Sequence, residues 1–191
     1  MAKEVVEYFD DTHTYCVNGV IVPSVSKLVL FALGDDMYSR VPPEVLKKAR
    51  IRGSEVHSAI EEYELNRTPS DAYPDVLESY EMLKKKYLLY VDKMEQIVNY
   101  GKHYCGRYDI LDKEGTLWDI KTTYKINKEY LAWQLGLYYL ALGVEKEVGY
   151  CLWIPKKGKP KVELIRPHSN KECKDLVEMF ERAQSEVNLA I

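Results

Sequence analysis

The feature that most constrains this chain is a predicted β-hairpin over residues 105–123. Aromatic, β-branched and other apolar residues fill its flanks, as is typical of strands, and residues 112–115 supply a turn that ends in glycine. Because side chains alternate between the faces of a strand, we expect Asp119, Lys121 and Thr123 to share one face. An acid beside a lysine is unusual in a core, so this strand is a candidate functional site.

The elements expected around this hairpin are both strands and helices. The first half of the chain is expected to contain a strand–turn–strand unit at 8–22 around Asn18-Gly19, a helix at 25–33 capped by Ser24, a helical pattern that starts at Pro42-Pro43, a helix with apolar residues spaced from Val76 to Val91 and a short strand at 96–99. Gly53 interrupts the pattern that starts at Pro42-Pro43, which predicts either two helical segments or one helix in close contact with another part of the chain there. The hairpin is followed by a buried helix at 128–142, a second hairpin at 148–165 and a helix that starts at Ser169 with a capping-box pattern. This order predicts an α/β (α+β) fold in which a mixed central β-sheet is flanked by helices.

The composition is that of an ordinary globular protein. The 191 residues are 46% hydrophobic and 30% charged, and this length suits one domain with a sizeable core. We expect a single domain over 1–191, made of an N-terminal hairpin with helices (1–95), a core sheet with its helix (96–166) and a C-terminal helix (168–191). No apolar run approaches the roughly 20 residues that span a bilayer, and residues 1–7 lack a signal-peptide core. We therefore expect a cytoplasmic protein with no membrane partner.

The net charge and the cysteines limit the cofactors and partners only in part. A net charge of −3 does not indicate a nucleic-acid-binding protein, but it leaves room for local basic patches. The four cysteines lie far apart and form no C-x-x-C pair: Cys16, Cys105, Cys151 and Cys173. We therefore expect reduced, partly buried thiols rather than a zinc ribbon or an iron–sulfur cluster held by neighbouring cysteines.

Asp109 and Asp119 are candidate ligands of a hard divalent cation, because such ions prefer carboxylate and carbonyl oxygens. The backbone carbonyl of Ile120 can supply a third oxygen. Lys121 would face the same pocket, where its ammonium could orient a water or stabilise developing negative charge. The D-x-K pattern alone is common, and the similar Glu172–Lys174 lies at a predicted helix start, where side chains two apart diverge. The strand setting is what makes the Asp119 version informative.

Four motifs resemble, in the same order, those of the PD-(D/E)XK nuclease superfamily, and within it the RecB-type and phage exonuclease-like branch. They are R-G-x-x-x-H at Arg52–His57, G-x-x-D at Gly106–Asp109, D-x-K-T at Asp119–Thr122 and Q-x-x-x-Y at Gln134–Tyr138. The segment His13–Ser26 is also similar to the N-terminal part of phage members. The resemblance implies a restriction-endonuclease-like core and a Mg²⁺- or Mn²⁺-dependent deoxyribonuclease that hydrolyses phosphodiester bonds.

The resemblance also implies a role for each matched residue. It implies that Asp109, Asp119 and His57 bind the metal, to which the Ile120 carbonyl can add an oxygen. Lys121 would act in catalysis together with the two acids. Gln134 and Tyr138 would contact the site or the DNA. Glu61, one turn beyond His57, is a further candidate, as a supporting acid or the ligand of a second metal. Relatives with an iron–sulfur cluster hold it with clustered C-terminal cysteines, which this chain lacks, so no cluster is expected.

Each of these residues also has a plain structural explanation. His57 could be a hydrogen-bonded structural histidine, Asp109 a surface acid near a turn, and Lys121 a strand-edge lysine that discourages aggregation. Gln134 and Tyr138 could form a polar pair in the core. The nuclease hypothesis explains all five residues at once, whereas the structural explanations require a coincidence.

The leading hypothesis is a DNA nuclease, exonuclease-like and of phage origin, that acts on double- or single-stranded DNA. A structure-specific or nicking endonuclease is the first alternative. Alternatives of another class are a catalytically silent relative that binds DNA or a protein, and an interaction protein that needs no metal. A homo-oligomer or a recombination partner protein is compatible with the sequence, since the last helix has an apolar face that could pack internally or against another subunit: Leu176, Val177, Phe180, Ala183 and Val187.

Overall fold

The structure is a computed structural model that describes residues 4–9, 12, 14–34, 39 and 41–189. Its elements are β1 (Val6–Phe9), β2 (Thr14–Val17), β3 (Val20–Val22), α1 (Val25–Leu33), α2 (Pro43–Asn66), α3 (Pro74–Lys86), β4 (Val91–Tyr100), β5 (Tyr104–Asp112), β6 (Leu117–Lys121), α4 (Lys128–Leu142), β7 (Gly149–Trp153), β8 (Lys161–Ile165) and α5 (Asn170–Leu189). Two residues named above, His13 and the side chain of Val187, lie outside this description.

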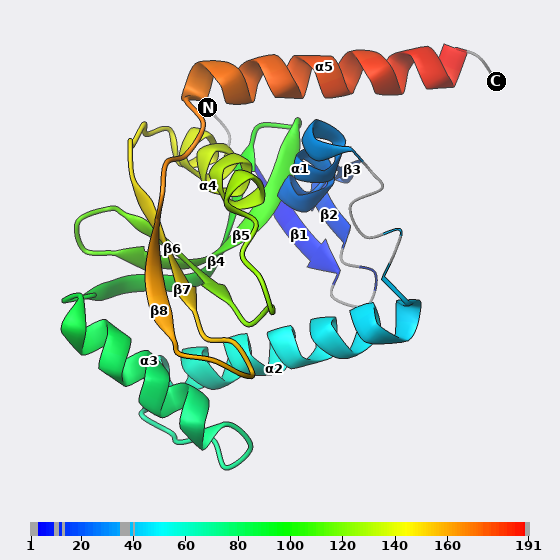
Figure 1. The fold of residues 1–191 in the computed structure, drawn as a ribbon. Coiled ribbons are helices and arrows are strands. Elements are labelled where there is room, and N and C mark those ends of the chain that lie inside the picture. Colours follow the sequence, from blue (N-terminus) through cyan, green and yellow to red (C-terminus); the bar gives the residue numbers. More distant parts are fainter. Residues whose placement is uncertain (1–3, 10–11, 13, 35–38, 40, 190–191) are drawn as a thin grey trace.

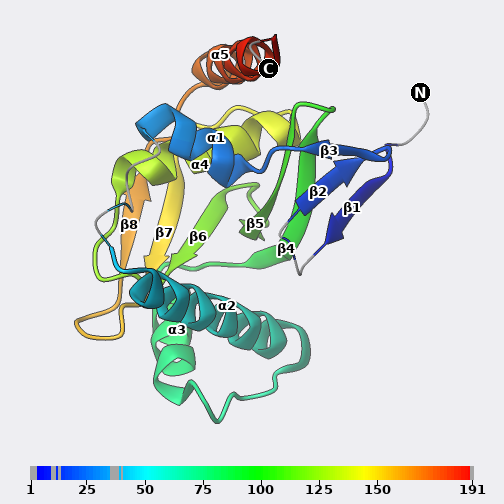
Figure 2. The ribbon, with the colours of Figure 1, turned by 90° about the vertical axis from the view of Figure 1, so that its right-hand side faces the viewer.

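The main sheet has five strands in the order β4-β5-β6-β7-β8. Its β6–β7 pair is parallel and the other three pairs are antiparallel. Helices α1 and α4 lie on one side with α5 as an outer layer, and α2 and α3 lie on the other (Figures 1 and 2). Two separate hydrophobic cores fill these layers, one against α4 and one against α2 and α3. The predicted α/β fold with a mixed sheet between helices is confirmed.

The predicted hairpin is formed by β5 and β6. Its turn closes with a hydrogen bond of 3.0 Å from the Gly115 amide to the Asp112 carbonyl, and Gly115 has a φ of +74°, which suits glycine. The prediction that Thr123 extends the second strand is wrong. The strand ends at Lys121, whose carbonyl accepts the Ile154 amide at 2.8 Å, and the Thr123 hydroxyl instead donates to the Lys125 carbonyl.

The predicted continuation of the third helix to Val91 is also wrong. Helix α3 ends at Lys86, and Leu88 turns the chain with a φ of +54°. The Leu89 amide donates to the Lys84 carbonyl at 2.9 Å, which closes a Schellman-type end. The ten residues from Val91 onward pair with β5 instead, so the expected short strand at 96–99 is the middle of a much longer one.

The N-terminal strands form a small sheet of their own, in the order β1-β2-β3. The predicted hairpin at Asn18-Gly19 is confirmed, and both residues have positive φ, as a type I′ turn requires. Strand β1 is an addition that the sequence did not predict. The small sheet meets the main one where the Cys105 amide donates to the Pro23 carbonyl at 3.0 Å.

The helices that carry motif residues begin and end largely as predicted. Helix α2 runs unbroken through Gly53, so the alternative of two segments is wrong, and no described residue makes the close contact with Gly53 that a single helix was expected to have. Helix α4 begins at its Asn127 cap and ends at Gly143. The capping box of α5 is confirmed, because the Ser169 amide donates to Glu172 at 2.8 Å and the Glu172 amide donates back to the Ser169 hydroxyl. Three residues of the predicted apolar face of α5 are buried, namely Leu176, Val177 and Phe180, and Cys173 of the same helix is buried with them. None of the helices in the described ranges has the length and apolar character needed to cross a membrane.

Candidate metal centre

His57 connects α2 to the centre of the sheet. Its Nε2 lies 3.0 Å from the backbone carbonyl oxygen of Ile120 in β6. Its Nδ1 lies 3.2 Å from Glu95 Oε1 in β4 and 3.5 Å from Asp109 Oδ1 in β5. Ligand atoms of His57, Glu95 and Asp109 all lie within 4.8 Å of one another. Three strands and one helix therefore contribute to a single cluster.

The two aspartates predicted as ligands are both buried, and they have different neighbours. Asp109 Oδ2 accepts the Ile120 amide at 2.6 Å, which leaves Oδ1 facing His57. Asp119, only 2% exposed, accepts a hydrogen bond from Lys121 Nζ through Oδ1 at 2.8 Å. Its Oδ2 is buried without an aligned hydrogen bond, although Lys121 Nζ lies 2.6 Å away. That oxygen has a lone pair available for another cation.

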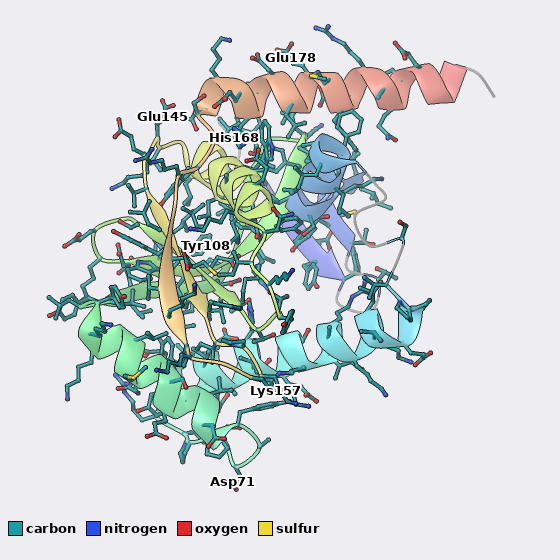
Figure 3. The ribbon with its side chains drawn as sticks, viewed as in Figure 1. Asp71, Tyr108, Glu145, Lys157, His168 and Glu178 are labelled. Carbon is teal, nitrogen blue, oxygen red and sulfur yellow. The ribbon has the colours of Figure 1, made fainter. Side chains whose placement is uncertain are left out.

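Helix α4 supports the lysine from the other side. Lys121 Nζ lies 3.4 Å from Gln134 Oε1, and the Gln134 amide nitrogen lies 3.4 Å from the Tyr138 hydroxyl. That hydroxyl donates to the Arg107 carbonyl at 2.8 Å, which ties the chain of contacts back to β5. Tyr108, labelled in Figure 3, lies edge-on to Tyr138 with ring centroids 6.5 Å apart. Gln134 and Tyr138 thus form a buried polar link that positions Lys121.

Close packing holds this link in place. A Cβ added to Gly106 would lie 2.6 Å from Tyr138 Cε1 and 2.7 Å from Val25 Cγ2. Only glycine allows α1, α4 and β5 to approach this closely. The glycine of the G-x-x-D motif therefore positions the tyrosine of the Q-x-x-x-Y motif.

The electrostatics of the cluster favour bound positive charge. Burial raises the pKa of Asp119 to about 6, against the opposing effect of Lys121, and burial also raises the pKa of Asp109. Burial alone would lower the pKa of His57, but the carboxylates of Asp109 and Glu95 outweigh it and raise the pKa to about 9. Burial alone would also lower the pKa of Lys121. The carboxylates of Asp119 and Asp109 outweigh burial and raise this pKa. Buried carboxylates here hold protons and cations tightly.

Glu95 is the residue of the cluster that the sequence did not reveal. It lies between the paired positions Met94–Ile110 and Gln96–Tyr108, and so stands opposite Asp109 across the ladder. Its backbone has a φ of +48°, which is uncommon for a residue with a side chain. The only sequence signal was an acid next to the short strand expected at 96–99, and the register that makes it meaningful is a property of the sheet.

Glu61 lies beside the cluster rather than within it. It lines an open cavity of about 660 Å³ together with His57, Glu95 and Arg107. Burial, followed by the charge of Glu95, raises the pKa of the Glu61 carboxyl. Glu61 is therefore not one of the three clustered side chains, and its role as a supporting acid or as the ligand of a second metal stays a prediction.

The donor set fits a hard divalent cation. It combines carboxylate oxygens from Asp109 and Glu95, a ring nitrogen from His57 and a carbonyl oxygen from Ile120, and Asp119 contributes a buried oxygen nearby. Oxygen-rich sets of this kind suit Mg²⁺ or Mn²⁺. Among the described residues, no other group of three His, Cys, Asp or Glu side chains comes together in this way.

Comparisons with known proteins bear on the fold. The chain is similar to the crystal structure of SSO0001, with a TM-score of 0.50 and 17% sequence identity over 85% of this chain and 76% of that chain. At this identity the likeness concerns the fold alone, and it agrees with a mixed sheet between helices. No protein-family model matches the chain, and no curated protein matches it.

Proposed function

We propose that this protein is a divalent-metal-dependent DNA nuclease of the PD-(D/E)XK superfamily, in its RecB-type and phage exonuclease-like branch. The observation that carries the proposal is the convergence of all four motifs on one buried cluster. His57 meets the Ile120 carbonyl at 3.0 Å, and the same peptide donates its amide to Asp109 at 2.6 Å. Residues that merely share a sequence pattern by chance would have no reason to meet.

The residues of the cluster divide into binding and positioning roles. His57, Asp109, Glu95 and the Ile120 carbonyl would hold Mg²⁺ or Mn²⁺. When bound, the cation supplies charge neutralisation at the scissile phosphate and makes a water more acidic. Asp119 holds Lys121 beside this position.

Lys121 acts as a charged hydrogen-bond donor rather than as a base. Burial opposes its charge, but Asp119 and Asp109 raise its pKa, so its Nζ keeps its proton at neutral pH. A charged Nζ can donate a hydrogen bond to the oxygen of an attacking water or to a phosphate oxygen as negative charge develops. Gln134 and Tyr138 fix its direction from α4.

The proposed compartment is the cytoplasm, of a cell or of an infected host. All four cysteines are free and buried, which suits a reducing environment. The proposed substrate is DNA, and an exonuclease action is proposed in preference to nicking. A circular substrate separates the two, because an exonuclease requires an end.

The test is cleavage of linear, circular and single-stranded DNA with Mg²⁺, with Mn²⁺ and with a chelator. Cleavage is expected only with metal, and Lys121→Ala and Asp119→Asn should lower the rate by about 10²–10³-fold. The matched control is Lys174→Ala, which alters the helical E-x-K that lies on α5. The proposal fails if the unaltered protein shows no metal-dependent cleavage, or if Lys121→Ala cleaves as fast as the control.

A further inference from the structure

Arg107 is an exposed, positively charged residue in a buried part of β5, beside the candidate metal cluster. From Tyr104 to Ile110 every residue of this strand is buried except Arg107, whose side chain is 43% exposed. Arg107 and Asp109 are two positions apart, so their side chains leave the strand on the same face. The guanidinium therefore projects next to the proposed metal ligands, although no motif assigns it a role.

Glu95 holds Arg107 and His57 in a fixed relation. Its Oε2 forms an ion pair with Arg107 Nε at 2.8 Å, while its Oε1 lies 3.2 Å from His57 Nδ1. The Tyr8 ring lies 5.5 Å below the guanidinium carbon. The ion pair with Glu95 is formed through Nε, and 43% of the Arg107 side chain remains exposed, so the guanidinium is accessible from the cavity that it lines.

Helix α2 contributes hydroxyl groups and a glycine to the lining of the cavity. Gly53, Ser54 and Ser58 of α2 line the same cavity of about 660 Å³ as Arg107. A Cβ added to Gly53 would meet no atom within 4 Å among the described residues, so their packing does not require glycine there. Glycine is a poor residue for the middle of a helix, and at this position it leaves the helix backbone accessible from the cavity.

The charges of the cavity narrow down what it can accept. Two acids, Glu61 and Glu95, line it together with Arg107 and His57, so the lining has no excess of positive charge that would attract an anion by itself. A phosphodiester that enters with a divalent cation is neutralised from one side by the cation and from the other by Arg107. Arginine suits this contact because its planar fork matches two phosphate oxygens.

We propose that Arg107 is a DNA-binding residue that clamps the backbone phosphate next to the scissile one. The position follows from Glu95, which stands between the guanidinium and His57 and so separates Arg107 from the reacting phosphate. This inference rests on the proposed nuclease function and adds a substrate contact to it. The competing explanation is that Arg107 only neutralises Glu95 and supports the fold.

The test measures binding of a short fluorescein-labelled DNA duplex by anisotropy over a series of salt concentrations. A Lys121→Ala background with Ca²⁺ prevents cleavage during the measurement. Arg107→Gln is expected to weaken binding about tenfold or more and to reduce the slope of log K against log salt by about 0.9, the value for one phosphate contact. Arg107→Lys should keep the slope but lose part of the affinity, because it retains the charge and loses the fork.

Arg182→Gln is the matched control. Arg182 pairs with Glu178 on α5, and Figure 3 labels Glu178 on the side of the molecule opposite α2. The control should leave the affinity and the slope unchanged. A purely structural role predicts that Arg107→Gln lowers thermal stability while the salt slope stays the same.

The possible outcomes separate this inference from the proposed function. If the unaltered protein cleaves DNA but Arg107→Gln binds with the same slope and affinity as the control, the clamp is refuted and the nuclease stands. If the unaltered protein neither binds nor cleaves DNA, the proposed function fails and the clamp fails with it.

Discussion

Alanine at Gly106 should destabilise the protein and disturb the candidate site from a distance. The new Cβ would lie 2.6 Å from Tyr138 Cε1 and 2.7 Å from Val25 Cγ2, whereas ordinary contacts begin near 3.4 Å. Both neighbours are buried, so neither can move without shifting α1 or α4. Overpacking of this kind costs about 1–3 kcal/mol. Since two neighbours are affected, we expect a loss near the upper end.

The assay compares Gly106→Ala with Gly53→Ala by urea and thermal unfolding. The loss at Gly106 corresponds to a fall in Tm of roughly 4–12 °C for a chain of this length. Gly53 lies in mid-helix with open space around its Cβ, so the same change there should stabilise by about 0.5–1 kcal/mol. Opposite signs for an identical substitution are the critical result. The packing argument is refuted if Gly106→Ala loses less than about 0.5 kcal/mol, or if both variants shift in the same direction.

Three further predictions follow from other contacts. His57 has a pKa of about 9 in the metal-free protein and must be neutral to bind a metal, so Mn²⁺ binding at pH 7 should release up to one proton and should strengthen as the pH rises towards 9. Calorimetry in buffers of different ionisation enthalpy measures the number of protons released. Release of the same number of protons by the His57→Gln variant would contradict the prediction. Glu95→Gln should weaken Mn²⁺ binding by roughly 10–100-fold, and an unchanged titration would remove Glu95 from the ligand set. Leu88→Gly should stabilise the folded protein by about 1 kcal/mol, because Leu88 has a φ of +54° and is 67% exposed. A lower urea midpoint for the variant would show that the Leu88 side chain stabilises the fold by more than its backbone strain costs.

Local signals predicted the elements whose ends depend on neighbouring residues. Helix α4 begins at the Asn127 cap and ends at Gly143, and both features belong to the helix itself. The β5–β6 hairpin is set by its turn in the same way. These signals need no knowledge of the remaining chain, and they placed Asp119 and Lys121 on one strand.

Features that depend on pairing between distant segments were not predictable. Residues 87 and 91 continue a helical spacing, but the ladder with β5 and the left-handed backbone of Leu88 determine the structure there. Glu95 joins the cluster only because β4 is paired in a register that places it opposite Asp109. Arg107 was part of a motif, yet its significance comes from being the exposed residue of a buried stretch.

The contact between His57 and Ile120 joins residues 63 positions apart. Contacts of large sequence separation require long loops to close first, and they tend to form late in folding. The three strands of the cluster can pair before α2 docks, but the set of ligands is complete only after docking. A chain in the course of folding, or one in which α2 has opened locally, would hold its carboxylates without the imidazole, so complete assembly of the candidate metal site would report the completion of the fold.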